Sequence, residues 1–409
     1  MKILVLNSGS SSQKSCVYDI AEVLPQNPPS CIWEGKIEWE GETAEAVVKN
    51  SQGATHKKRV TVGSRGAALE QLLDSLWRGE AQAISSPSDI DVVGHRVVHG
   101  GPYYEEPVVV TPDVKSAIAS VAAFAPLHSG AELEGMEIAK RLLGDVPQIA
   151  VFDTGFHRKM PLEATVYPGP YGWYESGIRR YGFHGINHQY CAGRAAQLLG
   201  ADVKSLKLVS CHLGNGCSVA AIRDGHSADT SMGFTPLEGL MMGTRSGSVD
   251  PGILTYLMRQ SSLTGKQLDE ILNRKSGLLG VSGISGDMRH ILAATKDGSR
   301  RAKLAFDIYV HRLQAGIGAM VAVLGGIDAL VFTAGIGENS PEVRAATCGN
   351  FGFLGLKLDA EKNANPSLDQ DISADGSPLR VLVIRAQEDW GIARECWKLV
   401  RAGSWATTK

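Results

Sequence analysis

The feature of this sequence that most constrains its fold is a strand, loop and returning strand that occurs twice. The first copy comprises the apolar residues 3–6, a polar loop at 7–14 and the apolar residues 16–20. The second copy comprises residues 206–210, a loop at 211–216 and residues 217–222. Both loops are rich in Gly, Ser and Asn, as hairpin turns commonly are. Two halves that open in the same way predict an internally duplicated α/β protein with a cleft between the halves.

The rest of the chain alternates between helical and strand patterns. Apolar residues at helical spacing predict helices at 67–77, 113–123, 131–142 and 300–324. Short apolar runs predict buried strands at 92–98, 149–152, 329–333 and 381–384, with a C-terminal helix after the last of them. A Gly-, Pro- and Tyr-rich connection at 155–185 is where we expect one domain to pass into the next. A length of 409 residues is enough for two or three domains.

Composition excludes several classes of partner. Lys and Arg number 41 against 43 Asp and Glu, with no long run of one sign, so we expect no binding to nucleic acid or to anionic membranes. The 7 cysteines are scattered without a CxxC pair, which is typical of reduced thiols in a cytoplasmic protein. The first apolar run is too short for a signal peptide, and no run approaches the ~18 residues of a membrane span.

Three Gly-rich loops could hold phosphate groups. They lie at 7–14, 212–218 and 334–339, each directly after an apolar strand, and their backbone N–H groups can form nests for phosphate oxygens. Each loop alone could equally be an ordinary turn, but three in one chain favour a bound nucleotide. The sequence contains no G-x-x-x-x-G-K-[ST], no complete G-x-G-x-x-G and no H-R-D, so the nucleotide would need a different scaffold.

The segment 94–101 places a cation beside an apolar side chain. In a strand, Arg96 and Val98 share one face, while His95 and His99 share the other. A guanidinium next to an aliphatic group suits a small carboxylate with an apolar tail, since Arg can bind both oxygens. The alternative is an Arg in a structural ion pair beside a core valine.

Two further motifs set one polar side chain between glycines, His184 in 181–185 and Arg245 in 243–248. Phosphoryl transfer requires mainly positioning and positive charge around the transferring group, which a His and two Arg could supply. His184 and His188 are also spaced as a zinc pair would be, but no general-base Glu lies between them.

Two acidic side chains occur near the ends of apolar strands. Asp153 follows residues 149–152, and Glu388 follows residues 381–384. Strand ends are the usual place for ligand groups in α/β sheets, and carboxylates can hold magnesium directly or through water.

Taken together and in order, these motifs resemble those of the acetokinase family, which includes acetate and propionate kinases, in the superfamily of sugar kinases, heat-shock ATPases and actin. The motifs that carry the resemblance, spread over essentially the whole chain, are Asn7-x-Gly9-Ser10-Ser11-Ser12-x-Lys14, Gly94-His95-Arg96, Val151-Phe152-Asp153-Thr154, Gly182-Phe183-His184-Gly185, His212-Leu213-Gly214-Asn215-Gly216, Gly243-Thr244-Arg245 and Gly335-Ile336-Gly337-Glu338-Asn339.

The resemblance implies a duplicated ribonuclease-H-like, actin-like ATPase fold, a homodimer, and reversible MgATP-dependent phosphorylation of acetate to acetyl phosphate and ADP by in-line transfer. It implies that residues 1–153 plus 386–409 form an N-terminal domain on the carboxylate and phosphate side, closed by the C-terminal helix. Residues 154–385 would form the nucleotide-binding domain. ATP is the implied co-substrate, and Mg²⁺, or Mn²⁺ in its place, the implied metal.

The resemblance also implies roles for single residues. The implied catalytic residues are Arg96, Asp153, His184 and Arg245. The implied substrate-binding residues are Arg96, Val98, Leu127, His128, Phe183 and Pro236. The implied ATP-binding residues are Lys14, His212, Leu213, Gly214, Asn215, Gly216, Asp287, Met288, Arg289, Gly335, Ile336, Gly337, Glu338 and Asn339. The implied metal-side residues are Asn7 and Glu388.

The chain departs from the family pattern at three places. Residues 127–130 read Leu-His-Ser-Gly where the family usually has Leu-His-Asn-Pro, which affects the rim of the substrate pocket. Residues 386–389 read Ala-Gln-Glu-Asp where the family usually has Thr-Asn-Glu-Glu, which affects the metal side. Cys217 adds a thiol beside the second Gly-rich loop.

Three other functions remain open at this point. The chain could be a propionate or other short-chain acyl kinase, or a non-catalytic protein that binds nucleotide to open and close its cleft. A sugar kinase would need polar side chains where Val98, Leu127 and Pro236 occur. The apolar character of that pocket favours acetate over longer carboxylates.

Overall fold

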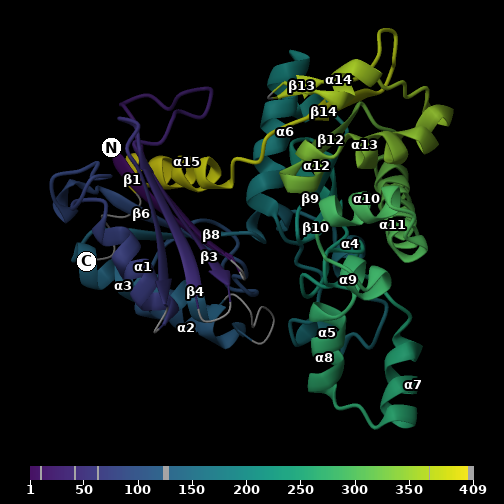
Figure 1. The fold of residues 1–409 in the computed structure, drawn as a ribbon, viewed down its shortest axis with the longest axis horizontal. Coiled ribbons are helices and arrows are strands. Elements are labelled where there is room, and N and C mark those ends of the chain that lie inside the picture. Colours follow the sequence, from purple (N-terminus) through teal and green to yellow (C-terminus); the bar gives the residue numbers. More distant parts are fainter. Residues whose placement is uncertain (10–11, 41–42, 62–63, 123–128, 368, 404–409) are drawn as a thin grey trace. The chain divides into compact units, whose positions relative to one another are not determined.

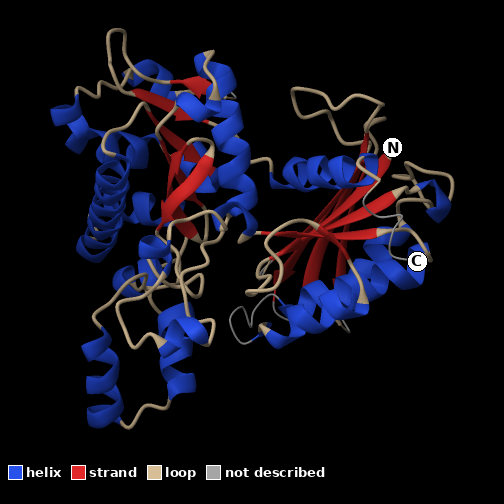
Figure 2. Ribbon diagram, turned by 180° about the vertical axis from the view of Figure 1, so that it is seen from behind, coloured by secondary structure: helices blue, strands red, loops and turns tan. Residues whose placement is uncertain are grey.

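The computed structural model describes residues 1–9, 12–40, 43–61, 64–122, 129–367 and 369–403 (Figure 1). Contacts divide the chain into two compact units. The first comprises Met1–Gly155 and Gln387–Lys409, and the second comprises Phe156–Ala386. Each unit is built on its own sheet, with helices on both faces (Figure 2).

The sheet of the first unit has 8 strands in the order β5-β4-β3-β2-β1-β6-β8-β7. Their bounds are β1 Lys2–Ser8, β2 Ser12–Asp19, β3 Trp33–Glu40, β4 Thr43–Asn50, β5 Thr55–Thr61, β6 Val92–Val97, β7 Val108–Val109 and β8 Gln148–Phe152. The hairpin partners β2 to β5 run antiparallel to their neighbours, whereas β1, β6 and β8 are parallel. Residues 3–6 of β1, 92–93 of β6 and 149–152 of β8 are apolar and buried, because helices cover both faces of these strands.

The helices of the first unit are α1 Arg65–Asp74, the short 3₁₀ helix η1 Pro87–Asp89, α2 Pro112–Ser120, α3 Ser129–Leu143 and α15 Glu388–Arg401. Helices α1 and α3 pack on one face of the sheet and α15 on the other (Figures 1 and 2). The core under α1 and α3 includes Trp33, Leu69 and Leu72. Gly94 in β6 lets α15 approach closely, since a Cβ there would lie 2.6 Å from Cys396 Sγ.

The sheet of the second unit has 6 strands in the order β11-β10-β9-β12-β14-β13. Their bounds are β9 Leu208–Leu213, β10 Cys217–Arg223, β11 His226–Thr230, β12 Ala329–Thr333, β13 Gln370–Asp371 and β14 Arg380–Val383. Strands β9 to β11 form antiparallel hairpins, and β9, β12 and β14 are parallel. Helix α6 packs on one face and α11 on the other (Figure 1).

The helices of the second unit are α4 Leu162–Thr165, α5 Gly172–Glu175, α6 Gly185–Leu199, α7 Pro251–Ser261, α8 Gly265–Arg274, α9 Gly277–Ser282, α10 Met288–Lys296, α11 Arg300–Leu324, α12 Ala334–Asn339, α13 Pro341–Cys348 and α14 Ala360–Ala364. The 3₁₀ helices η4 Val203–Ser205 and η5 Gly349–Leu354 complete it, and η3 Gly155–His157 lies where the units join in sequence. Among the described residues, no helix combines the length and the apolar character needed to cross a membrane.

The two sheets share one topology. In each, a central strand forms a hairpin with the next strand, a third strand extends that hairpin, and two later strands add in parallel on the other side. The order β3-β2-β1-β6-β8 thus repeats as β11-β10-β9-β12-β14. The duplication expected from the two strand-loop-strand segments is present in the structure.

Three expected element boundaries were wrong or inexact. Strands β1 and β2 extend into the expected loop, so Asn7 pairs with Lys14 across the hairpin. Cys211, His212 and Leu213 belong to β9 for the same reason, since the ladder continues until the chain must turn. Residues 334–339 form helix α12 instead of a loop, while α11 begins and ends where its pattern predicts, between Ser299, which caps it, and Gly325.

Candidate active site

The first candidate region lies at the carboxyl ends of β1, β6 and β8. Arg96 in β6 donates from Nε and Nη2 to the carboxylate of Asp153, with 2.6 Å between Nη2 and Oδ2. Arg96 Nη1 donates to Oδ1 of Asn7 in β1 at 3.2 Å. Parallel strands bring their carboxyl ends to one edge of the sheet, where α/β proteins bind ligands. Residues with three different expected roles therefore form one hydrogen-bonded group.

Helix α15 adds two carboxyl groups to this region. Asn7 Nδ2 donates to Asp389 Oδ1 at 2.7 Å and to Glu388 Oε2 at 3.3 Å. Asp389 was not among the expected site residues, although it is the neighbour of Glu388 in sequence. The start of a helix is a favourable place for both carboxylates because its N–H groups carry partial positive charge.

The first region is strongly charged. Burial opposes the charge of Arg96, but the carboxylates of Asp153 and Glu388 outweigh it and hold the pKa of Arg96 above its ordinary value. The guanidinium therefore stays protonated. Burial raises the pKa of Asp389, and its hydrogen bond from Asn7 acts in the opposite direction.

Other expected residues of the first unit are placed as follows. Lys14 lies in β2 with an exposed side chain. Val98 is buried just beyond the end of β6. Leu127 and His128 lie outside the described residues.

The second candidate region is a cluster of histidines in the second unit. The rings of His184 and His212 stack with centroids 4.0 Å apart. Ser218 Oγ lies 2.9 Å from His184 Nδ1 and 2.8 Å from His188 Nε2, while His188 Nδ1 contacts Ser210 Oγ at 2.9 Å. Burial holds the pKa of His188 well below its usual value, so this ring is neutral.

The backbone is strained at two positions around this region. His184 adopts φ 58° directly before α6, and Ala334 adopts φ 65° at the start of α12. Left-handed φ values at non-glycine residues persist only where the surroundings impose them, and they are common at functional sites.

Arg245 faces His184 across the hairpin between β9 and β10. A Cβ at Gly216 would lie 3.4 Å from Arg245 Nη1 and 3.5 Å from His184 Nε2. Arg245 Nη1 donates to Pro236 O at 3.0 Å, and burial lowers the pKa of Arg245. No ion pair to Arg245 exists among the described residues, so its positive charge is available to an anion.

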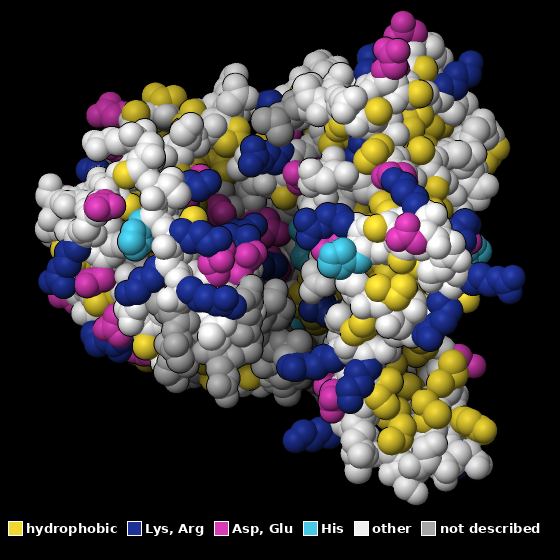
Figure 3. Space-filling view, in the orientation of Figure 1, with side chains coloured by type: hydrophobic (Ala, Val, Ile, Leu, Met, Phe, Trp, Pro, Cys, Tyr) yellow, Lys and Arg dark blue, Asp and Glu magenta, His cyan; other side chains and the backbone are white. Residues whose placement is uncertain are grey.

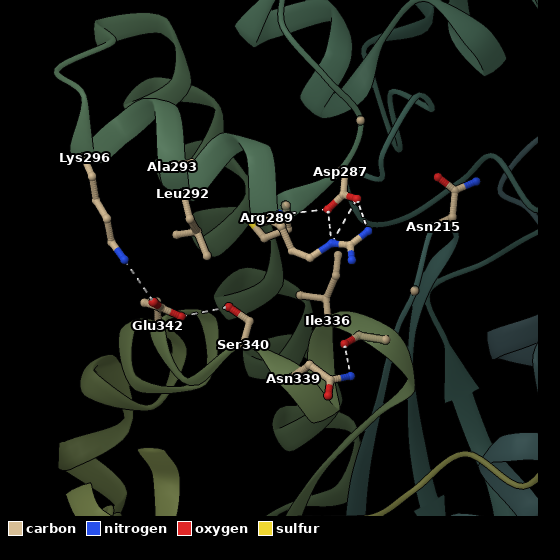
Figure 4. A pocket seen from close by; sticks show the side chains of 14 residues that line it. Asn215, Asp287, Arg289, Leu292, Ala293, Lys296, Ile336, Asn339, Ser340 and Glu342 are labelled. Carbon is tan, nitrogen blue, oxygen red and sulfur yellow. Dashed lines mark hydrogen bonds and ion pairs between the residues drawn. The ribbon is translucent and has the colours of Figure 1, made fainter. Parts of the chain in front are cut away.

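A cavity of about 770 Å³ lies within the second unit (Figure 4). Its volume is in the range of small-molecule sites. Expected ATP-binding residues that line it are Gly214, Asn215, Asp287, Met288, Arg289, Gly335, Ile336 and Asn339. Lining residues that were not expected are Gly286, Leu292, Ala293, Lys296, Ser340 and Glu342. The missed ones belong mostly to α10 and the start of α13, whose amphipathic pattern looks like that of any surface helix.

The polar side chains at the cavity are organised in pairs. Arg289 Nη2 lies 2.5 Å from Asp287 Oδ2, and Asp287 caps α10 by accepting from Arg289 N (Figure 4). Lys296 Nζ lies 3.9 Å from Glu342 Oε1 on the other side. Cations therefore occur on both sides of a partly apolar cavity.

The remaining expected ATP-binding residues do not line the cavity. His212 and Leu213 are buried in β9, and Gly337 is buried against Phe332. Gly216 faces His184 and Arg245, as described above. Glu338 Oε1 accepts from Ala386 N at 2.8 Å and so ties α12 to the end of the second unit.

A fully buried arginine, Arg344, hydrogen-bonds to the backbone carbonyls of helix α12. Arg344 Nη1 donates to the carbonyls of Gly337 and Glu338 at 2.8 Å, and its Nε and Nη2 donate to Asn363. Helix α12 provides three residues of the cavity lining. Sequence alone gives no sign that this arginine is buried.

The thiol of Cys217 donates to the carbonyl of Gly214 in the hairpin loop, with 3.4 Å between Sγ and O. It is fully buried and lies 3.3 Å from Tyr309 OH. Burial raises the pKa of Cys217 to about 11, so it stays a thiol at neutral pH. The departure at this position leaves the loop surface unchanged in charge.

The oxygen atoms of the first region fit a magnesium ion. Magnesium in phosphoryl-transfer sites uses one or two carboxylates together with substrate phosphates and water. Glu388 and Asp389, whose carboxyl oxygens both accept from Asn7 Nδ2, provide such donors. Within the described part of the chain, no cluster of three or more His, Cys, Asp or Glu side chains is arranged to hold a metal without further ligands.

The fold and the two regions define an α/β protein of two units, one with a charged site at its strand ends and the other with a cavity of small-molecule size. The profile of the Acetokinase family matches residues 2–394. The chain belongs to the acetokinase family.

Curated relatives are similar over their full length. The chain is 56% identical to the acetate kinase of Cyanothece sp. over 406 residues, which cover 99% of this chain and 100% of that protein. It is 58% identical to the acetate kinase of Nostoc punctiforme over 404 residues, which cover 98% and 100%.

Solved structures give the same result. The Porphyromonas gingivalis acetate kinase matches with a TM-score of 0.88 and 38% identity, covering 98% of this chain and 99% of that one. A propionate kinase from Francisella tularensis matches with a TM-score of 0.87 and 36% identity, covering 96% and 98%. The predicted duplicated actin-like ATPase fold is confirmed.

Proposed function

We propose that this protein is an acetate kinase, a phosphotransferase that uses ATP to convert acetate reversibly to acetyl phosphate. Full-length identity of 56% to 58% with acetate kinases supports the activity. The observation that carries the chemistry is the Arg96–Asp153 pair, a guanidinium oriented by a buried carboxylate at the strand ends.

In this proposal Arg96 binds the carboxylate of acetate. Its Nη1 and Nη2 atoms each carry a second hydrogen, beyond those donated to Asn7 and Asp153, and can therefore hold a carboxylate. Asp153 holds the guanidinium in that orientation, and Val98 offers an apolar contact for the methyl group. The resemblance to the family assigns substrate binding to Leu127, His128, Phe183 and Pro236 as well.

The second unit supplies the phosphoryl side. ATP occupies the cavity lined by α10, α12 and the β9–β10 hairpin. One oxygen of acetate attacks the γ-phosphorus, and the bond from that phosphorus to the ADP oxygen breaks, so no proton has to move. His184 and Arg245 donate to the phosphoryl oxygens as charge spreads over them, which lowers the barrier to transfer. Lys14 adds positive charge near the phosphates.

A magnesium ion would be held by Asn7 and Glu388, with Asp389 beside them. When bound, it neutralises charge on the β- and γ-phosphates. Manganese has similar ligand preferences and can replace it.

The test is to trap acetyl phosphate with hydroxylamine from acetate, ATP and Mg²⁺. We expect a hydroxamate signal that depends on all three. Loss of the signal with acetate but not with propionate would instead support a propionate kinase, which the similarity to the Francisella protein makes the second candidate. Nucleotide binding without any hydroxamate would support a binding protein that uses ATP only as a switch.

We also propose that the enzyme is a homodimer that acts in the cytoplasm. Helix α7 has no buried residue, and it exposes Ile253, Tyr256 and Met258 by 46% to 57% (Figure 3). A second copy of the chain would cover such an apolar surface. Light scattering should give twice the chain mass of 43.6 kDa.

The proposed location in the cytoplasm rests on the cysteines. They are all free, which supports a reducing compartment.

A further inference from the structure

A buried glutamate near Arg96 has no role in the reaction described above. Glu132 lies in the first turn of α3 and is only 2% exposed. Its neighbours on the same helix, Glu134 and Glu137, are exposed as glutamates usually are. A fully buried carboxyl group is uncommon, so its contacts are informative.

One oxygen of Glu132 holds the backbone where the chain leaves β6. Oε1 accepts from Val98 N at 3.0 Å. Strand β6 ends at Val97, whose carbonyl accepts from Asp153 N at 2.9 Å, so the amide of Val98 lies just beyond the strand. Glu132 thus fixes the backbone two residues after Arg96.

The other oxygen is buried without a hydrogen bond. Oε2 of Glu132 has no partner among the described residues. An ionised carboxylate in such a place lacks the hydrogen bonds that would replace water, whereas the protonated acid carries less charge to desolvate. Burial raises the pKa of Glu132 to about 8, opposed by the Val98 N–H and by Arg96.

The charges around Glu132 come from several elements. Strand β6 contributes Arg96, and the end of β8 contributes Asp153, while His95 of β6 pairs with Gln148. Burial lowers the pKa of His95 to about 4, so that ring is neutral above pH 6. On the helices that pack against α3, Lys115 pairs with Glu137 of α3, Glu70 pairs with Arg141 of α3, and Asp89 accepts from the N–H groups of Ser85 and Ser86, while Asp113 lies in the first turn of α2.

We propose that Glu132 is a positioning residue for the carboxylate substrate: it anchors the Val98 backbone and, as a neutral acid, leaves the positive charge of Arg96 to the substrate. The inference rests on the proposed function. Arg96 already faces the carboxylates of Asp153 and Glu388, so a third negative charge would oppose the binding of acetate.

The test measures the KM for acetate from pH 6.5 to 9.5 in the wild type and in Glu132→Gln. Glutamine keeps an acceptor for Val98 N–H but cannot ionise. We expect the wild-type KM to rise about tenfold above pH 8, with a smaller change in kcat, since a nearby like charge weakens anion binding. In Glu132→Gln the KM should change less than about twofold over the same range. Glu137→Gln, on the exposed side of α3, should follow the wild type.

A second readout does not depend on activity. Because the folded protein keeps the Glu132 proton that the unfolded chain releases above about pH 4.3, wild-type stability should fall as the pH rises toward 8. Thermal unfolding should therefore show Glu132→Gln gaining in Tm relative to the wild type between pH 6 and 9. Equal pH profiles of KM and Tm in the two proteins would overturn the inference. Absence of acetyl phosphate at every pH would instead overturn the proposed function.

Discussion

The two units have sheets of the same topology but carry different functional side chains at the strand ends. At the strand ends of the first unit, the polar side chains are charged, and they pair as Arg96 with Asp153 and Asn7 with two carboxyl groups. In the second unit, the corresponding edge carries buried histidines, of which His188 is neutral, together with serines and glycines, and Arg245 is its cation. Duplication gave both units the same sheet topology. The side chains that follow each strand then determine which ligand each unit can bind.

This contrast follows from what each ligand needs. A small carboxylate is bound by a fixed cation, and that cation needs a buried counter-charge to orient it. A nucleotide needs space and backbone donors with little side-chain bulk, which the cavity glycines at 214, 286 and 335 provide.

The largest expected effect comes from removing the cation of either unit. Arg96→Ala and Arg245→Ala should each lower kcat/KM by about 10²–10³, because each removes a preorganised charge aimed at the reacting groups. Steady-state kinetics with circular dichroism would measure this. Arg78→Ala, which breaks only an exposed pair with Asp74, is the matched control and should have no effect. A folded Arg96→Ala enzyme with more than about a tenth of the activity would show that the charged region is only structural.

The buried arginine of the second unit should separate nucleotide binding from acetate binding. Arg344→Met leaves the carbonyls of Gly337, Glu338 and Asn363 unpaired, at about 1–3 kcal/mol for each buried group. We expect a lower Tm and a KM for ATP raised about tenfold, with an unchanged KM for acetate. A rise in both KM values would mean that the two units do not bind their ligands independently.

The third prediction concerns Ser218, whose hydroxyl contacts the rings of His184 and His188. Ser218→Ala removes the hydroxyl that orients His184, and we expect kcat to fall about tenfold with a shifted pH profile. Ser227→Ala is the matched control, since Ser227 bonds His157 instead. Equal losses in both variants would assign the histidine cluster to stability alone.

The two units should differ in their response to pH, although burial of His95 makes the first unit, like the second, less stable in acid. Burial lowers the pKa of His157 to about 4 and that of His188 well below its usual value. Their neutral forms stabilise the second unit fully above pH 6.5, and this stability is lost as the pH falls toward 4. Glu132 and Asp389 have raised pKa values, so the first unit loses stability as the pH rises. Hydrogen exchange at pH 5 and pH 9 should show faster opening of the second and the first unit, respectively.

The smallest expected effect concerns chain length. Val98→Ala enlarges the space next to Arg96, and the ratio of kcat/KM for propionate to that for acetate should rise about fivefold or more, since a methylene in an apolar pocket is worth ~1–3 kcal/mol. Competition assays with both carboxylates would measure the ratio. An unchanged ratio would place the methyl group elsewhere.

The sequence predicted the parts of the fold that follow from periodicity. Helix α11 and strand β12 begin and end at the expected residues, since apolar spacing and caps determine them locally. Helix α12 was missed because its Gly-rich sequence has low helix propensity, and Arg344 stabilises it from a distance.

The sequence likewise predicted only some residues of the candidate site. Motifs predicted roles for Arg96, Asp153 and His184, whose neighbours in sequence are distinctive, and the structure brings Arg96 and Asp153 together. Asp389 and Glu132 were missed because their roles depend on burial, and a glutamate in the first turn of an amphipathic helix is normally exposed. Only the three-dimensional packing shows that Glu132 is buried while Glu134 is exposed.

Helix α15 has a consequence for the order in which the protein folds during synthesis. It covers one face of the first sheet and joins Asp389 to Asn7 across 382 residues of chain. Synthesis runs from the N-terminus at ~5–20 residues per second, so the first unit is the earliest to leave the ribosome and the last to be completed. The second unit has all of its strands before α15 emerges. A nascent chain would therefore hold its nucleotide cavity before it holds the carboxyl groups that complete the site, and its first activity would be binding without turnover.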